Sequence, residues 1–176
     1  MTRAQGLLLL GIIAAGGALT WRLVRGGADQ LPAAAAGTLA VQWRGSQRGT
    51  AVFPARVNWC PVNRTGVLEA IAGDTGVVVV IYEANALTAG PHAVVMPGIP
   101  SVLPRPGASV VMRWPKDSSA LLAFASQSGL VDLRLAPKLL SGTLSIRMRA
   151  ASGSDSLTLI GNFTDLPVVA MAVGCP

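Results

Sequence analysis

Apolar and polar residues alternate with a period of two through most of this chain, and this alternation limits the possible folds more than any other feature. The segment GTLSIRMRA (142–150) places four apolar side chains on one face and Thr, Ser and Arg side chains on the other. Such alternation is typical of a strand with one face in a core and one in water. SLTLIGNFT (156–164) repeats the pattern after the turn sequence SGSD, so the two segments predict a hairpin.

Further apolar runs predict strands along the rest of the chain after Gly37. Clusters of Gly, Pro, Asp and Ser separate the runs at intervals of about 8 to 14 residues, a spacing typical of a sandwich or barrel rather than of βαβ units. VVVVI (77–81) has no polar alternation and predicts a central strand covered on both faces. GDTG (73–76) predicts a hairpin turn. The predicted runs are 38–44, 50–59, 67–72, 77–83, 92–96, 109–114, 121–126 and 131–135.

These patterns predict an all-β domain over residues 38–176, an antiparallel β-sandwich of about eight to ten strands. Immunoglobulin topology does not follow, because the Cys, Trp and Cys spacing of that fold is missing. Residues 118–128 are the one place after the linker where a single helical turn fits the sequence. The strand order stays open.

An apolar leader precedes this domain. Gly6 to Leu19 is uncharged and follows Arg3, which is the pattern of an export signal or signal anchor. Counted as a helix, Ala4 to Val24 spans about 31 Å, which matches a bilayer core of about 30 Å. We therefore expect one transmembrane or signal helix over residues 1–25 and a linker over residues 26–37.

A retained anchor and a cleaved signal both fit the leader. The continuation WRLVR is a poor cleavage site, and it places Trp21, Arg22 and Arg25 at the membrane interface. Small residues on the helix would allow close packing against other transmembrane helices, namely Gly11, Ala14, Ala15, Gly16, Gly17 and Ala18. A cleaved form secreted to the periplasm remains the alternative.

The chain has two cysteines, Cys60 and Cys175. In an exported protein they are expected to form one disulfide that ties the carboxyl-terminal tail to an early strand, and two buried free thiols are the alternative. A zinc site is disfavoured, because two cysteines and the single His92 do not complete four ligands. A disulfide would place the domain in the periplasm, with the amino terminus in the cytoplasm and a single pass through a bacterial inner membrane.

SGTLSIRMRA (141–150) and SLTLIGNFTDLPV (156–168) resemble the closing strands of uncharacterised bacterial exported β-sandwich domains, which are often lipoproteins. Those domains end in a Gly-Thr strand and a Gly-x-Phe-x-Asp/Asn-x-Pro strand. The resemblance extends over residues 37–175 and implies a fold and a compartment, with no activity attached. The chain departs from the lipoproteins in having no cysteine after the leader for lipid attachment.

Composition and motifs argue against most forms of chemistry. The net charge is +6, yet the arginines are scattered singly among only eight aromatic residues, so nucleic-acid binding is not expected. No nucleophile elbow, metalloprotease motif or P-loop is present. His92 is expected to be a solvent-facing or hydrogen-bonded strand residue, and the acidic residues fall mostly in turns or at outward positions. We expect no enzyme activity, no cofactor and no metal site.

The segment MPGIPSVLPRP (96–106) is the strongest candidate for a contact with a partner. Its prolines stiffen the backbone and expose apolar side chains, which suits docking. The alternative is a crossover packed on its own domain. The candidate contact residues are Pro97, Ile99, Pro100, Val102, Leu103 and Pro104.

Together these features predict a non-enzymatic, membrane-anchored structural or assembly subunit whose periplasmic β-sandwich packs on a larger inner-membrane complex. We expect a host of the respiratory or photosynthetic (reaction-centre or light-harvesting) kind, a choice that follows from the architecture and from no single residue. The alternative is a free exported module that binds a small apolar ligand or a cell-envelope component. The partners expected for the anchored subunit are the membrane and other protein subunits of the complex, and no nucleic acid.

Overall fold

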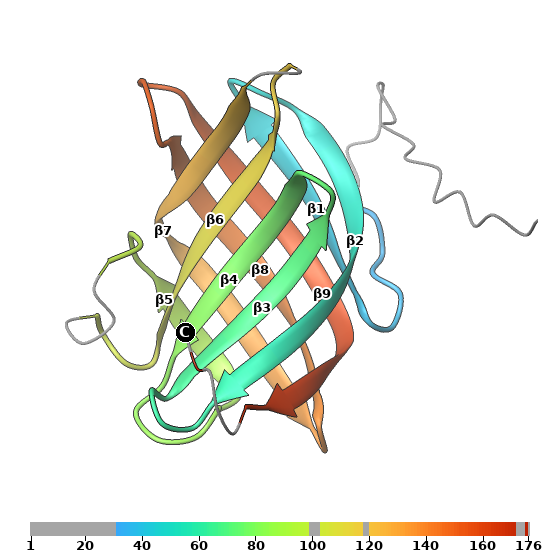
Figure 1. Ribbon diagram of the computed structural model, residues 1–176, viewed down its shortest axis with the longest axis vertical. Helices are drawn as coiled ribbons and strands as arrows, with labels where there is room; N and C mark the ends of the chain where they lie inside the picture. The colour runs from blue at the N-terminus through green and yellow to red at the C-terminus, as the bar shows by residue number, and fades with distance from the viewer. Residues whose placement is uncertain (1–30, 99–102, 118–119, 172–174, 176) are drawn as a thin grey trace, which may run out of the picture.

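A computed structural model describes residues 31–98, 103–117, 120–171 and 175, and all its regular elements are strands (Figure 1). The strands are β1 (Thr38–Gly45), β2 (Gly49–Cys60), β3 (Thr65–Ala72), β4 (Thr75–Tyr82), β5 (Gly90–Val94), β6 (Gly107–Pro115), β7 (Leu121–Ala136), β8 (Leu139–Ala150) and β9 (Ser156–Ala170).

The predicted leader helix lies outside the described residues. The same holds for its proposed interface residues Trp21, Arg22 and Arg25 and for its small-residue stretch from Gly11 to Ala18. Within the ranges that the structure describes, none of the elements is a helix of the length and hydropathy needed to cross a bilayer.

The nine strands form one sheet that closes on itself in the order β1-β2-β3-β4-β6-β5-β7-β8-β9. The prediction of an all-β domain is confirmed. The arrangement differs from the predicted sandwich of two sheets, because the sheet is continuous from β1 round to β9 and β9 pairs again with β1. Alternation shows that each strand has one buried face, but a sandwich and a closed sheet both satisfy that pattern.

The two predicted strands 121–126 and 131–135 are a single long strand, β7. A bulge between Ser126 and Ser128 shifts its register against β8, and this irregularity falls in the polar sequence SQSG that interrupts the alternation. The helical turn considered at residues 118–128 is wrong, because the structure places Leu121 onward in β7. The predicted hairpin of residues 142–164 is formed by β8 and β9.

Strand β5 is inserted between β6 and β7 at the lower end of the barrel in Figure 1. Higher up, β6 pairs directly with β7, and below that point β5 runs parallel to β6 and antiparallel to β7. Ser126 lies where the strands part. Its hydroxyl accepts the Val110 N–H at 3.0 Å and donates to the Val95 carbonyl at 2.6 Å, so it replaces ladder bonds that the split removes.

Side chains fill the interior of the barrel. At the upper end, Trp114 packs against Trp43 with ring centroids 5.5 Å apart and stacks on Phe124 at 5.2 Å. Below them lies an aliphatic middle section. The largest fully buried side chains are Phe53, Phe124, Phe163, Leu39, Leu68, Ile81, Met112, Leu133, Leu140, Ile146, Met148 and Leu159. The barrel is therefore a packed core rather than a channel.

The closing strands that carry the family resemblance meet at a bulge. Phe163 lies opposite Gly142, and a Cβ at position 142 would stand 2.6 Å from the Phe163 ring and closer still to a backbone oxygen, so only glycine fits there. Asp165 adopts a φ of 50°, its N–H donates to Ser141 Oγ at 2.9 Å, and the Ser141 hydroxyl donates to its carboxylate at 3.1 Å. This bulge bends β9 toward β2.

Candidate functional site

The lower rim of the barrel holds the seam that closes it. Below the bend, β9 leaves β1 and pairs in parallel with β2, from Val168 opposite Val57 to Ala170 opposite Trp59. The Met171 N–H then donates to the Trp59 carbonyl at 2.8 Å. This parallel contact is only three residues long, so the chain needs a further constraint to hold its last strand in place.

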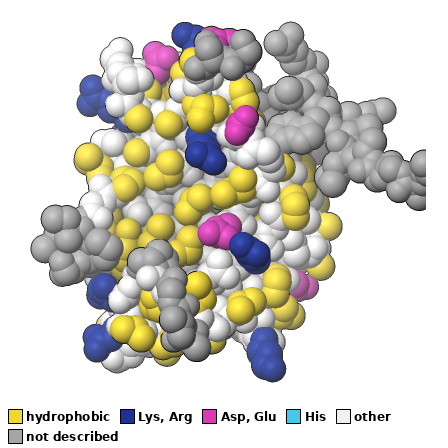
Figure 2. All heavy atoms as spheres, viewed as in Figure 1, with side chains coloured by type: hydrophobic (Ala, Val, Ile, Leu, Met, Phe, Trp, Pro, Cys, Tyr) yellow, Lys and Arg dark blue, Asp and Glu magenta, His cyan; other side chains and the backbone are white. Residues whose placement is uncertain are grey.

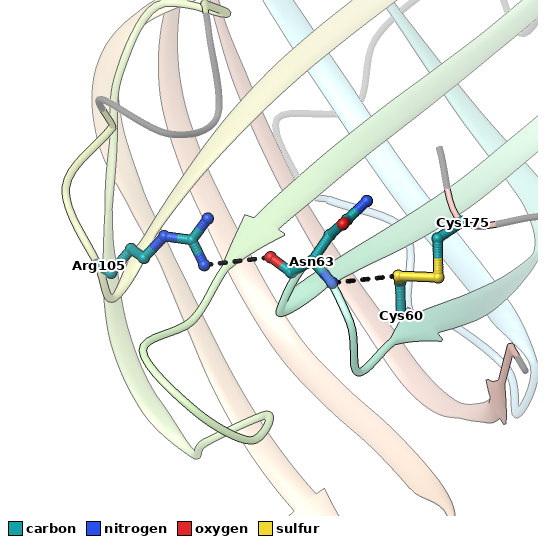
Figure 3. The surroundings of a disulfide bond; sticks show 4 residues. All are labelled: Cys60, Asn63, Arg105 and Cys175. Atoms are coloured by element: carbon teal, nitrogen blue, oxygen red, sulfur yellow. Dashed lines mark hydrogen bonds between the residues drawn. A yellow bond between two sulfur atoms is a disulfide. The ribbon is translucent and has the colours of Figure 1, made fainter.

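A disulfide lies beside this short contact. Cys60 ends β2 and is joined to Cys175, with the two Cα atoms 5.6 Å apart (Figure 3). The geometry is consistent with the disulfide expected from the sequence. The bridge spans a sequence separation of 115 residues, so it fixes the tail against the strand that it pairs with and reinforces the closure of the barrel.

Arg105, in the segment between β5 and β6, links two other loops at the same rim, the β2–β3 loop and the β4–β5 loop. Its guanidinium Nη1 donates to the carbonyls of Glu83 at 2.6 Å, Asn63 at 3.3 Å and Arg64 at 3.4 Å. The Asn63 N–H in turn points at Cys60 Sγ at 3.4 Å, so the arginine, the loop after β2 and the disulfide form one connected group (Figure 3). The proline-rich segment is therefore attached to the barrel at its carboxyl end.

The predicted partner-contact residues fall partly within this description. Pro97 and Pro104 are exposed and Leu103 is half-buried. Ile99, Pro100 and Val102 lie outside the described residues. Attachment through Arg105 fits a crossover packed on its own domain, whereas the exposed prolines fit docking, so the contact stays a prediction.

A buried acid–base pair, which the sequence interpretation missed, lies inside this rim. Glu83 follows β4 and is 2% exposed, and His92 in β5 is 1% exposed. His92 Nε2 lies 2.8 Å from Glu83 Oε1. The same carboxylate accepts the Thr88 N–H at 2.8 Å and the Thr88 hydroxyl at 2.9 Å.

Both ring nitrogens of His92 are engaged in these contacts. Nδ1 lies 3.0 Å from the Gly90 carbonyl, which only accepts, so Nδ1 carries a proton and donates it. Nε2 is engaged by the Glu83 carboxylate at 2.8 Å. No ring nitrogen remains for a substrate, and neither side chain is accessible, so the pair is suited to holding the β4–β5 loop rather than to acid–base catalysis.

The expectation that the acidic residues lie mostly in turns or at outward positions is wrong for Glu83. Glu83 continues the inward series Val77, Val79 and Ile81 by one more step of two residues. His92 lies two residues before the inward Val94 on β5, so it falls on the same inward face. Extending the alternation past the last apolar residue would have placed both groups in the interior.

Among the described residues, no group of three or more His, Cys, Asp or Glu side chains is arranged to hold a metal ion. A shallow surface groove lies over β2 and β3, lined by Pro54, Ala55, Arg56, Glu69 and Ile71. Arg56 Nη2 and Glu69 Oε2 form an ion pair across it at 3.0 Å. This pair occupies the polar groups of the groove, which leaves the groove few contacts for a polar ligand.

The outer surface of β3, β4 and β6 carries several apolar side chains where a solvent-facing sheet is normally polar, and Glu69 lies among them, opposite Val78. VVVVI is predicted to be covered on both faces, and the structure bears this out for the inward face, where Val77, Val79 and Ile81 are fully buried. On the outward face, Val78 and Val80 are half-buried, and none of the described elements forms a second layer over them. Figure 2 shows hydrophobic side chains over this side, with acidic and basic side chains among them. The apolar face consists of Val67, Ile71, Val78, Val80 and Val111.

Comparison with known proteins adds no relative: no protein-family model matches the chain, and no curated protein or solved structure is significantly similar to it. The resemblance of its closing strands to exported β-sandwich domains therefore stays a prediction.

Proposed function

We propose that this protein is a non-enzymatic structural or assembly subunit, anchored by its leader in a bacterial inner membrane, whose periplasmic β-domain packs on a larger membrane complex. A host of the respiratory or photosynthetic kind remains the expectation from the architecture. The apolar face is the surface that we assign to the contact with another subunit.

The apolar face is the observation that carries this proposal. On β8 the outward positions are Thr143, Ser145, Arg147 and Arg149, which is the polar pattern of a strand in water. On the apolar face, in contrast, Ile71 is 42% and Val111 38% exposed beside three half-buried valines. These apolar side chains surround the ion pair Arg56–Glu69, whose charges already neutralise each other. Apolar surface of this kind favours an interface, because covering it with a partner removes it from water.

The packed interior speaks against the alternative of a free exported module with an internal ligand. A small apolar molecule would have to displace side chains such as Phe53, Phe124 or Phe163, which are already fully buried. The engaged His92 and Glu83 likewise offer a substrate no reactive group. These observations support a role in binding another protein through the outer surface.

The disulfide supports the proposed compartment. A cross-link that closes the barrel persists in an oxidising space such as the periplasm and is rare in the cytoplasm. With the domain outside, a retained leader places the amino terminus inside.

The proposal is tested by extracting membranes of the source organism in mild detergent and separating complexes by native electrophoresis. The wild-type chain should migrate with a large assembly. Replacing Ile71 and Val111 together by Glu should release it as a free chain, because two charges would be buried in the interface. The matched control is Leu130→Glu, which adds a charge at a residue of 44% exposure on β7, outside the apolar face.

Wild-type protein that migrates as a free chain would contradict the proposal. So would a double variant that stays in the assembly as firmly as the Leu130→Glu control. Each variant must also be shown to be folded with its disulfide intact, by its mobility on a non-reducing gel. This control separates loss of docking from loss of folding.

A further inference from the structure

The barrel has a second distinctive outer face, on the side opposite the apolar face. Figure 1 shows β3, β4 and β6 in front and β1, β8 and β9 behind them. On the rear side, Arg147 in β8 and Arg44 in β1 both lie opposite Thr158 in β9. Arg149 lies opposite Ser156. All five side chains are exposed and outward, and we call them the basic face.

The spacing of strands brings these arginines close together. Adjacent strands are about 4.8 Å apart, so Arg44 and Arg147 are separated by about 10 Å across Thr158, and Arg149 is about 7 Å further along β8. The outward positions of β8 and β1 hold no Asp or Glu. Asp165 lies at the far end of β9, and Asp155, in the turn before Ser156, is the nearest acid in sequence. The face is therefore basic and rich in hydroxyl groups.

The linker crosses the same side of the barrel. Ala36 forms a parallel bridge with Thr164, the Gly37 N–H donates to the Thr164 carbonyl at 2.8 Å, and the Ala34 N–H donates to Asn162 Oδ1 at 3.0 Å. Followed backward from Gly37, the chain thus runs over β9 from Thr164 past Asn162, in the direction of Thr158. The tether to the leader leaves the barrel on the side that carries the basic face.

We propose that the basic face lies against the anionic phospholipid headgroups of the bilayer that holds the leader. This rests on the proposed function, in which the leader stays in the membrane. Guanidinium groups bind phosphate through paired N–H donors, and threonine and serine hydroxyls add further donors. The tether holds this side close to the bilayer, which leaves the apolar face on the opposite side for a protein partner.

Each arginine near an anionic surface favours the contacting orientation by about five-fold, so the three together favour it by on the order of 100-fold over a detached head. The effect requires anionic lipid. It should disappear in a bilayer of phosphatidylcholine alone.

The test uses the full chain, carrying the photoreactive residue p-benzoylphenylalanine in place of Thr158, reconstituted in vesicles of phosphatidylcholine mixed with phosphatidylglycerol. Illumination followed by intact mass spectrometry should show the chain with one phospholipid added. The same label in place of Val78, on the apolar face, should give little lipid adduct. Arg147→Gln with Arg149→Gln should lower the ratio of contacting to detached orientations by about 25-fold, since two arginines are removed, and should therefore lower the adduct at position 158. Arg113→Gln with Lys116→Gln, which removes two exposed charges outside the basic face, should leave it unchanged.

Equal lipid adducts in phosphatidylcholine alone and in the anionic vesicles would overturn the proposal, as would labelling of lipid from position 78 rather than 158. The same labelled chain can be illuminated in native membranes. An adduct with a protein rather than with lipid would also overturn the proposal, because the basic face would then be a subunit contact. A separate control tests the membrane anchor. In each of these outcomes the chain should stay bound to the vesicles when they are washed with alkaline carbonate, because the leader holds it. Release of the chain by that wash would instead overturn the membrane anchor, and with it both proposals.

Discussion

Removing His92 should strongly destabilise the barrel at its lower rim. The His92→Ala variant leaves the Glu83 carboxylate buried at 2% exposure with only the two Thr88 donors. Breaking one side of a buried, hydrogen-bonded pair typically costs about 3 to 5 kcal/mol. Glu83→Gln keeps an acceptor for Thr88 and a similar volume, so it should cost less, about 1.5 to 3 kcal/mol, the value of a lost hydrogen bond to a charged group.

The double variant Glu83→Leu with His92→Leu provides the sharper test. It removes both polar groups and replaces them with apolar volume, which in other proteins has been close to neutral compared with breaking the pair. We expect it to be more stable than the sum of the single Leu variants by about 2 kcal/mol, within the range of coupled residues in contact.

Urea unfolding of the full chain in detergent micelles, followed by tryptophan fluorescence with the disulfide intact, gives the free energies for this cycle. If each single substitution costs less than about 1 kcal/mol and the double variant is simply additive, the pair does not hold the rim in the way described.

Three further predictions concern the closure of the barrel. Replacing Cys60 and Cys175 by Ser should lower the free energy of unfolding by about 5 kcal/mol, the chain-entropy value for a separation of 115 residues, and a urea midpoint that moves by less than about 0.5 M would show that the tail is held by other contacts. Ser126→Ala should cost about 1 to 3 kcal/mol, because it leaves a buried N–H and a buried carbonyl without their partner, whereas Ser126→Thr, which keeps the hydroxyl, should cost less in the same urea titration. Gly142→Ala should destabilise by at least about 1 kcal/mol, since its methyl would clash with the Phe163 ring and a backbone oxygen, and a thermal midpoint equal to wild type would refute the packing at this bulge.

Local alternation was enough to predict the strands, because a half-buried strand carries its period of two within a few residues. The hairpin of β8 and β9 and the turn at Gly73 followed from sequence signals that lie next to each other. At that turn Gly73 takes a φ of 60°, which glycine adopts without strain.

Closure of the sheet was not predictable in the same way. It depends on the pairing of β9 with both β1 and β2 and on the insertion of β5 between β6 and β7, all contacts between segments distant in sequence. β7 was divided into two strands because the polar sequence at its bulge interrupts the alternation, although backbone pairing with β8 resumes at Ser128.

The candidate site was partly accessible from the sequence. The cysteine pairing could be predicted because the chain has only two cysteines and its leader indicates export to an oxidising space. The burial of Glu83 could have been predicted by carrying the alternation of β4 one step further. The contacts of Arg105 could not, since its three acceptors are backbone carbonyls, which have no sequence signature. The same is true of the basic face, whose arginines are singly placed in the sequence and gathered only by the register of β8, β9 and β1.

Intact-mass measurement of the chain taken directly from membranes, with thiols alkylated before and after reduction, tests the central claim of a retained anchor and a disulfide-closed head. The account predicts an 18.0 kDa chain beginning at Met1 in the membrane fraction, with Cys60 and Cys175 alkylated only after reduction. A soluble chain beginning near Asp29, or a membrane-bound chain whose two thiols react before reduction, would contradict it.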